Sequence, residues 1–195
     1  GFSILLTDVN NLYINDFYLP TGDLRDEVRS STRADIIIAT KCKSTFTEEH
    51  RQKVTRELKP LPHQQLFFST IEYGVPHHIL HTGEYYHLHK ELEVLLVTGI
   101  ANIEPLKRYI LDHTYTYERM SFGDHHIFTI DDLREIKKRF SKISSHKKII
   151  ITTEKDAVRL MKFQAELEDL PLYVLPIEHK ILFDEENRLK EAVSS

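Results

Sequence analysis

Short runs of apolar residues alternate along the chain with longer segments in which apolar residues recur every three or four positions. The runs at 34–40, 94–98 and 148–152 are rich in Ile, Val and Leu and lack polar alternation. This pattern is typical of parallel strands buried on both faces. The predicted strands are residues 3–7, 34–40, 66–73, 85–89, 94–98, 117–122, 148–152 and 172–175.

Capping signals and apolar stripes predict helices between these strands. Thr45 and Glu48 have the spacing of a capping box for a helix over about 47–58. Thr129 and Asp132 have the same spacing ahead of the clearest apolar stripe in the chain. Further helices are predicted after Asn102, after Thr153 and over residues 185–193. Successive strand–helix units predict an α/β fold with right-handed crossovers.

The middle of the chain is less regular. Between residues 70 and 91 apolar residues are sparse, and Gly74, Pro76 and Gly83 interrupt the pattern. We therefore predict an amino-terminal domain over residues 1–69, a β-ribbon linker over 70–91 and a carboxyl-terminal Rossmann-like α/β domain over 92–195.

Composition narrows the class of protein. The chain has 195 residues, of which 41% are hydrophobic and 29% charged, as in ordinary globular proteins. No apolar run approaches the roughly 20 residues needed to cross a bilayer. A net charge of -4 with interspersed acids and bases argues against nucleic-acid binding. The single Cys42 excludes an internal disulfide and fits a reducing cytoplasm.

The fold class predicts where the chemistry lies, because open α/β sheets bind ligands beyond the carboxyl ends of their strands. The residues at these ends are Asp8, Thr40, Lys41, Thr98, Gly99, Asp124, His125, His126 and the segment 152–156. Among them, Asp124, His125 and His126 combine a carboxylate and two imidazoles at adjacent positions. We regard this triplet as the main candidate for proton-transfer or ligand chemistry.

Several segments also stand in the order seen in tetraacyldisaccharide 4'-kinases, and the chain resembles the carboxyl-terminal portion of that family. The segments are 19–26, 34–41, 98–102, 122–126 (Phe-Gly-Asp-His-His) and 152–160 (Thr-Thr-Glu-Lys-Asp-Ala-Val-Arg-Leu). Gly123 and Ile103 stand where the family usually has proline. The resemblance implies an ATP-dependent lipid kinase that phosphorylates the 4'-hydroxyl of a tetraacyldisaccharide 1-phosphate in lipid A biosynthesis.

The resemblance also implies the cofactors, the substrate and the location of the enzyme. It implies ATP and Mg2+ as cofactors of the complete enzyme, a lipid A disaccharide precursor as substrate, and a peripheral position at the cytoplasmic face of the inner membrane. Residues 1–69 would be the remaining part of a P-loop kinase-like domain. None of the six glycines begins a G-x-x-x-x-G-K-[ST] loop, and the family's Asp-Asp-Gly-Phe-Gln magnesium stretch is missing. We therefore expect earlier elements to precede Gly1 and this segment alone to be inactive.

By the same resemblance, His125 is our first choice to assist the base, an aspartate of the missing half, that takes the proton of the 4'-hydroxyl. Asp124 or His126 would orient it. The residues alone do not decide between the two histidines. The structural alternative is that Asp124 caps the following helix and both histidines are polar surface residues.

Seven further residues are candidates for substrate or nucleotide binding: Arg25, Thr40, Lys41, Asn102, Glu154, Lys155 and Asp156. Each has a structural alternative. Arg25 could pair with a neighbouring acid. Thr40 and Lys41 could simply end a strand, and Asn102 could cap a helix. Residues 154–156 could be a helix start whose acids, Glu154 and Asp156, complement the helix dipole.

Three rival interpretations remain open. Asp-His-His is also a signature of DHH-type manganese phosphoesterases, but such two-metal sites need several further ligands, and no Asp-x-Asp stretch occurs here. A non-catalytic α/β module that binds a nucleotide or a protein partner is the second. The third is a zinc site at His77, His78 and His81. We predict no metal site, because the only cysteine is distant and the context is linker-like.

Overall fold

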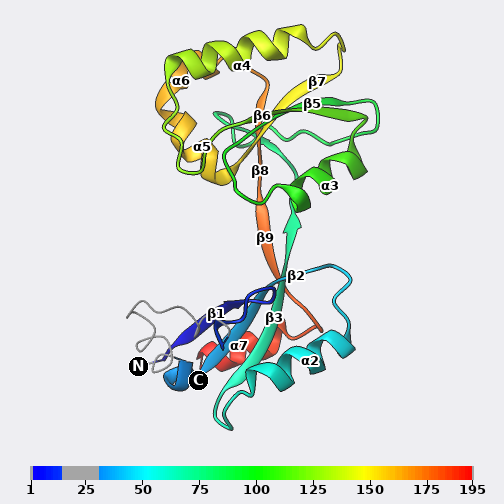
Figure 1. The fold of residues 1–195 in the computed structure, drawn as a ribbon. Coiled ribbons are helices and arrows are strands. Elements are labelled where there is room, and N and C mark those ends of the chain that lie inside the picture. Colours follow the sequence, from blue (N-terminus) through cyan, green and yellow to red (C-terminus); the bar gives the residue numbers. More distant parts are fainter. Residues whose placement is uncertain (1, 15–30, 195) are drawn as a thin grey trace. The chain divides into compact units, whose positions relative to one another are not determined.

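The structure, a computed structural model, describes residues 2–14 and 31–194. The chain divides into two compact units, each built around one sheet (Figure 1). Unit 1 comprises Gly1–Glu72 and Glu178–Ser195, and unit 2 comprises Tyr73–Ile177. Unit 1 is therefore made from two separate stretches of sequence.

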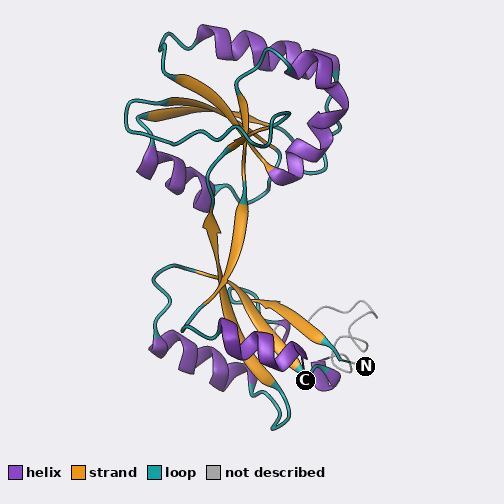
Figure 2. Ribbon diagram, turned by 180° about the vertical axis from the view of Figure 1, so that it is seen from behind, coloured by secondary structure: helices purple, strands orange, loops and turns teal. Residues whose placement is uncertain are grey.

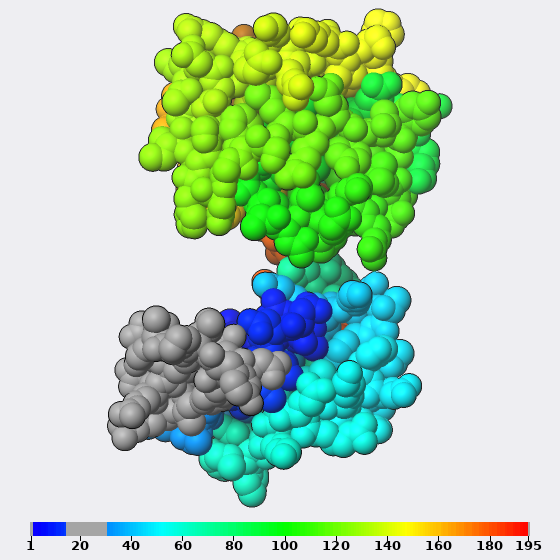
Figure 3. Space-filling view, in the orientation of Figure 1, coloured from blue at the N-terminus to red at the C-terminus, as the bar shows by residue number. Residues whose placement is uncertain are grey.

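Unit 1 contains a four-stranded sheet in the order β1-β2-β3-β9. Its strands are β1 (Ile4–Asp8), β2 (Ile36–Cys42), β3 (Gln65–Tyr73) and β9 (Ile177–Ile181), and its helices with described bounds include α2 (Glu48–Leu58) and α7 (Glu186–Ser194). The first three strands are parallel. Val54 and Leu58 of α2 pack with Phe68 in one core cluster, and Phe67 packs with Ala192 of α7 in another. In the space-filling view, the cyan segment around α2 forms part of the surface of unit 1 (Figure 3).

Unit 2 contains a five-stranded sheet in the order β4-β8-β7-β5-β6. The strands are β4 (His77–His78), β5 (Glu93–Thr98), β6 (Thr116–Ser121), β7 (Lys148–Thr153) and β8 (Leu172–Leu175). All pairs are parallel except β4 with β8. The helical elements are α3 (Glu104–His113), α4 (Ile130–Lys142), α5 (Glu154–Leu160), η2 (Met161–Phe163) and α6 (Gln164–Leu167). The α/β class with parallel sheets and helices is confirmed.

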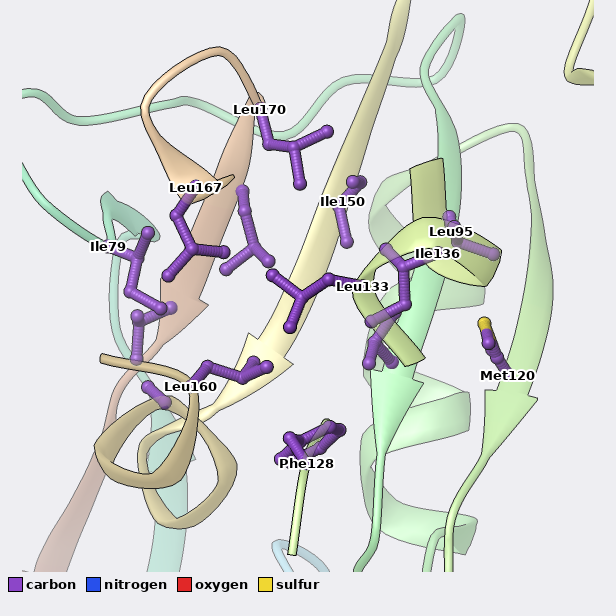
Figure 4. Packing of buried hydrophobic residues seen from close by; sticks show 14 of the residues in the cluster. Ile79, Leu95, Met120, Phe128, Leu133, Ile136, Ile150, Leu160, Leu167 and Leu170 are labelled. Carbon is purple, nitrogen blue, oxygen red and sulfur yellow. The ribbon is translucent and has the colours of Figure 1, made fainter. Parts of the chain in front are cut away.

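The core of unit 2 has two faces because successive side chains of a strand point to opposite sides of the sheet. Leu95 of β5 packs with Leu133 and Ile136 of α4, as the close-up shows (Figure 4). The next residue, Leu96, packs in the other cluster with Leu106 of α3. Helices lie beside the strands of both units (Figure 2). The doubly covered sheet explains why the strands read as unbroken apolar runs.

The units differ from the predicted domain boundaries in two places. The segment 70–91, expected to be a linker, belongs mostly to unit 2, where Ile79 is 4% exposed in the core. Residues from Glu178 onward, expected in the carboxyl-terminal domain, join unit 1 through β9 and α7. Apolar periodicity predicts strands and helices but not which sheet a strand joins.

Two local predictions also differ from the structure. The capping box of α2 is formed by Thr47 and His50, not by Thr45 and Glu48. The extended run at 85–89 is not a strand; its Tyr85 makes an isolated bridge with His77. By contrast, the predicted capping box of α4, Thr129 with Asp132, is confirmed.

Within the described parts of the chain, every helix is too short or too polar to span a lipid bilayer.

Candidate functional site

The carboxyl ends of β5, β6 and β7 bring three loops of unit 2 together. Gly99, after β5, lies so close to its neighbours that an added Cβ would be 2.8 Å from the carbonyl oxygen of Gly123 and 3.2 Å from Oδ1 of Asp156. Real Cβ atoms essentially never make a contact shorter than 3.0 Å, such as the one with Gly123. Glycine is therefore needed at position 99 to let the loops meet.

Asp156 lies at the centre of this edge and is 0% exposed. Its Oδ2 accepts hydrogen bonds from Gly99 N at 3.0 Å, Thr98 Oγ1 at 3.2 Å and Thr153 Oγ1 at 2.8 Å. Oδ1 accepts no hydrogen bond from the described residues, and it lies 3.9 Å from Nη1 of Arg159. A buried carboxylate normally requires such donors and a cationic partner.

Asp124 and Lys155 form an ion pair at the exposed rim of the same edge. Lys155 Nζ lies 2.5 Å from Asp124 Oδ1, which also accepts the backbone N–H of His125 at 3.0 Å. The hydrogen bond from Lys155 is the largest cause that lowers the pKa of the Asp124 carboxyl, and the backbone N–H of His125 lowers it further. Asp124 is therefore an anion over the whole neutral range, as a carboxylate stabilised by cations should be.

His125 is the exposed imidazole of the site. Its side chain is 77% exposed, and its backbone has a φ of 61°, an uncommon conformation for a residue with a side chain. Arg159 Nη2 lies 3.2 Å from Nδ1 of the ring, and Nε2 lies 3.6 Å from Asp124 Oδ2. A guanidinium group only donates, so Nδ1 accepts and a neutral ring carries its hydrogen on Nε2.

His126 is held differently. Its Nε2 lies 2.9 Å from Asp132 Oδ2, and its ring packs against Phe122 and Phe128. The same oxygen of Asp132 accepts from the backbone and hydroxyl of Thr129. Burial raises the pKa of the Asp132 carboxyl, but these hydrogen bonds outweigh it and leave the pKa lowered. His126 is thus tied to the start of α4.

Three of the predicted binding residues form hydrogen bonds to groups of the protein itself. Glu154 Oε2 accepts from the backbone of Ile177 at 3.1 Å. Asn102 Oδ1 accepts from Glu104 N at 3.2 Å, at the start of α3. Asp156 is buried against groups of the protein itself, so we do not propose it as a direct nucleotide ligand.

The candidates in unit 1 lie at the carboxyl end of its own sheet. Lys41 Nζ is 2.7 Å from Asp8 Oδ2, and Thr40 Oγ1 donates to the carbonyl oxygen of Thr7 at 3.2 Å. Partial burial opposes ionisation of Asp8, but hydrogen bonds from Lys41 and Asn10 leave its pKa lowered. Arg25 lies outside the described residues.

A hollow of about 580 Å³ elsewhere in unit 1 is lined by arginines of α2 and α7. Two of them, Arg51 and Arg188, are paired with Oε1 of Glu185 at 2.9 and 2.6 Å. Both cations share the carboxylate of Glu185, and Arg51 also lies 3.5 Å from Oε2 of Glu48. We therefore interpret the cluster as the attachment of the carboxyl-terminal segment.

Among the histidines at 77–81, His78 has both ring nitrogens engaged by the chain itself. His78 is 5% exposed; its Nδ1 accepts from the backbones of Leu80 and His81, and its Nε2 lies 3.1 Å from the carbonyl oxygen of Leu170. Both ring nitrogens are thus used in holding the chain. Across residues 2–14 and 31–194, no group of three or more His, Cys, Asp or Glu side chains could hold a metal ion.

Sequence reasoning missed Arg159 as a site residue. It stands one helical turn after Asp156 in α5, and this i,i+3 spacing of opposite charges was visible. Its contact with His125, which comes from a different loop, was not. Asp132 was identified as a capping residue, but not as the partner of His126.

Parallel sheets covered by helices, with charged loops gathered at the carboxyl ends of the strands, define a Rossmann-like α/β protein. The family described as Tetraacyldisaccharide-1-P 4'-kinase matches residues 1–195, and the chain belongs to this family. A "Tetraacyldisaccharide 4'-kinase" of Bacteroides thetaiotaomicron is 37% identical over 205 residues, covering 99% of this chain and 54% of the relative.

Two further proteins are similar to this chain. A protein of the same name from Phocaeicola vulgatus is 39% identical, covering 95% of this chain and 52% of the relative. A crystal structure of LpxK from Aquifex aeolicus in complex with ATP has a TM-score of 0.50 at 18% identity, covering 99% of this chain and 51% of that one. At that identity the likeness shows the fold. The chain spans about half the length of the curated relatives it matches.

Proposed function

We propose that this chain is part of an ATP-dependent kinase that phosphorylates the 4'-hydroxyl of a tetraacyldisaccharide 1-phosphate, the lipid A precursor. The observation that carries the proposal is the family match along the whole of residues 1–195. The substrate is acylated, so we also propose that the complete kinase works at the cytoplasmic face of the inner membrane. By complete kinase we mean this chain together with the part of its relatives' length that it does not span.

The proposed contribution of this chain to the reaction comes from the carboxyl edge of unit 2. Phosphoryl transfer requires an oriented acceptor hydroxyl and positive charge near the transferring group. With Nδ1 occupied by Arg159, His125 offers a hydrogen bond from Nε2. It is therefore suited to orient an acceptor oxygen or a carboxylate base, and it need not take the proton itself. Lys155, 43% exposed beside Asp124, supplies a cation for a substrate or nucleotide anion.

We propose that the phosphates of ATP and the Mg2+ ion are held mainly by the part of the kinase that this chain does not span. The sequence has no glycine-rich phosphate loop, and its described residues contain no group of side chains fit for a metal ion. We therefore derive no step through either of them. In unit 1, Thr40 and Lys41 follow a buried strand, where they are positioned to contact a nucleotide held by the rest of the kinase.

The first experiment compares phosphate transfer by this chain alone with transfer by the complete kinase. We expect no turnover from the chain alone, because the phosphate loop is missing, and turnover from the complete kinase. Activity of the isolated chain would contradict the proposal that it is only a part. Manganese-dependent hydrolysis of a phosphodiester would favour a DHH-type enzyme instead.

The second experiment separates the two histidines. In the complete kinase, we expect His125→Ala to lower kcat by about 10-fold or more while leaving stability nearly unchanged, because the ring is 77% exposed. His126→Ala is the matched control. It should lower stability, because it removes the contact with Asp132, and should change kcat less. Normal turnover of His125→Ala would exclude the proposed role.

A further inference from the structure

We propose that Asp156 is a positioning residue that fixes the ring orientation and hydrogen placement of His125 by acting through Arg159. The inference rests on the proposed function, because it explains how the histidine assigned to that reaction is held. It extends the site inward from the exposed rim to a carboxylate that no substrate reaches. The chain of contacts runs from Asp156 to Arg159 to His125.

Asp156, the inner end of this series of contacts, is held in place by hydrogen bonds. Asp156 is 0% exposed and its Oδ2 receives three hydrogen bonds, from the loop after β5 and from the start of α5. Oδ1 is turned toward Arg159, at 3.9 Å from Nη1. A carboxylate with one oxygen fixed in this way presents the other in a set direction.

Arg159 connects the buried carboxylate to the exposed ring. Nη1 is buried and receives no hydrogen-bond partner among the described residues, so its attraction to Asp156 is electrostatic. Nη2 reaches His125 Nδ1 at 3.2 Å. The guanidinium group is planar, so anchoring one amino group sets the direction of the other. A lysine would provide the charge without this geometry.

His125 depends on that contact. Its ring is largely in solvent, and the nearest other partner of its nitrogens is Asp124 Oδ2 at 3.6 Å. That distance is too long for a hydrogen bond. Because Arg159 donates to Nδ1, the ring cannot carry a hydrogen there. Nε2 therefore holds the hydrogen, and because Asp124 Oδ2 at 3.6 Å does not accept it, Nε2 can donate to another acceptor.

The adjacent histidine provides an internal comparison. His126 is oriented directly by a carboxylate, Asp132, at 2.9 Å, without an arginine between them. The two rings are neighbours in sequence, yet they are held by independent sets of residues. Variants of Asp132 therefore serve as matched controls for variants of Asp156.

The inference is tested first in this chain, by nitrogen NMR of the arginine and histidine side chains. In the unaltered protein we expect separate signals for the two Arg159 amino groups and an unprotonated Nδ1 in His125. In Asp156→Asn the Arg159 signals should merge into an average, and those of His125 should move toward the values of a solvated imidazole. Asp132→Asn should change the signals of His126 and leave His125 unaffected.

A second variant covers the case in which Asp156→Asn does not fold. Arg159→Met leaves all three hydrogen bonds to Asp156 Oδ2 in place and should release His125 in the same way. Unchanged His125 signals in a folded Arg159→Met protein would overturn the inference.

Turnover of the complete kinase separates this inference from the proposed function. We expect Asp156→Asn and Arg159→Met each to lower kcat by about 10-fold with little change in KM, and to cause no further loss in the His125→Ala background. Further multiplicative loss in that background would mean a merely structural role and would overturn the inference. Normal turnover of His125→Ala, with the NMR changes present, would instead refute the proposed role of His125 and leave the contact chain standing.

Discussion

The carboxyl edges of the two sheets hold their charged side chains in different ways. In unit 2, Asp156 is wholly buried and ties the loops after β5 and β7 together. In unit 1, Asp8 and Lys41 form a single ion pair whose side chains are 28% and 61% exposed. One edge is a network with a buried centre, and the other is a surface pair.

This difference indicates how each edge contributes to a site. Buried, fully engaged polar groups set positions precisely enough for chemistry but are costly to disturb. Exposed pairs contribute little to stability and rearrange easily when a ligand arrives. We therefore expect unit 2 to present a preformed surface and unit 1 to adapt to what binds it.

The largest expected effect is that of Asp156→Ala. It removes the acceptor of three buried hydrogen bonds, so unit 2 should lose about 3 kcal/mol of unfolding free energy. Asp8→Ala, the counterpart in unit 1, should cost about 1 kcal/mol or less. Hydrogen exchange of the amides in β7 and β2 measures the two units separately. Equal losses would remove the distinction between the edges.

The next effect concerns the close approach of the loops. Gly99→Ala should destabilise unit 2 by about 2 kcal/mol, because the new methyl group would meet Gly123 O at 2.8 Å and the loops must move apart. Gly123→Ala is the control: nothing lies within 4 Å of its added Cβ, and its cost should stay within about 0.5 kcal/mol. Denaturant unfolding of both variants checks this. Similar midpoints would show that the loops at this edge are not tightly packed.

A smaller effect is expected in acid. The pKa of Asp132 is lowered in the folded protein, so its ionised form stabilises unit 2 above the ordinary carboxyl pKa of 3.8, and this contribution is lost as the pH falls through the lowered value. Asp132→Asn should reduce stability at pH 6 by about 1 kcal/mol and show a smaller further loss below pH 4 than the unaltered chain. Parallel pH profiles would contradict the assigned pKa direction.

The smallest expected change is in the reactivity of Cys42, the only cysteine of the chain. It lies at the end of β2, is 4% exposed, and burial raises its pKa to about 11. Thiolate is therefore scarce at neutral pH, and alkylation should be slow and should report only openings of unit 1. Asp8→Ala should accelerate it several-fold, whereas Asp156→Asn should not. Fast alkylation of the unaltered protein would show that the edge of unit 1 is open.

Much of the fold could be predicted from the sequence pattern, because the signals that define its helices and strands come from residues close together in sequence. The capping box of α4 and the buried strand β5 depend on residues close together in sequence, and both are present as predicted. The capping box of α2 was shifted by two residues because His50 occupies the third helical position, and histidine is not among the usual residues there.

The site was less predictable because its contacts are tertiary. The sequence identified the strand ends that carry Asp124, His125 and Lys155, since parallel strands end on one edge. It did not identify the Arg159–His125 contact, which joins residues 34 positions apart. It also did not show that Asp156 points inward, because a charged residue at a helix start is usually solvated.

The return of the chain to unit 1 after Ile177 makes unit 2 an insertion within unit 1. The two ends of this insertion are adjacent, since Gly74 N donates to the carbonyl oxygen of Pro176 at 3.0 Å. During synthesis, unit 2 emerges from the ribosome before β9 and α7 do. Unit 2 can therefore fold first, while the sheet of unit 1 waits for its last strand. Because the two ends of unit 2 are neighbours, a circular permutation could join them and open the chain elsewhere. The linear order of the units would change, but the contacts within each unit would not.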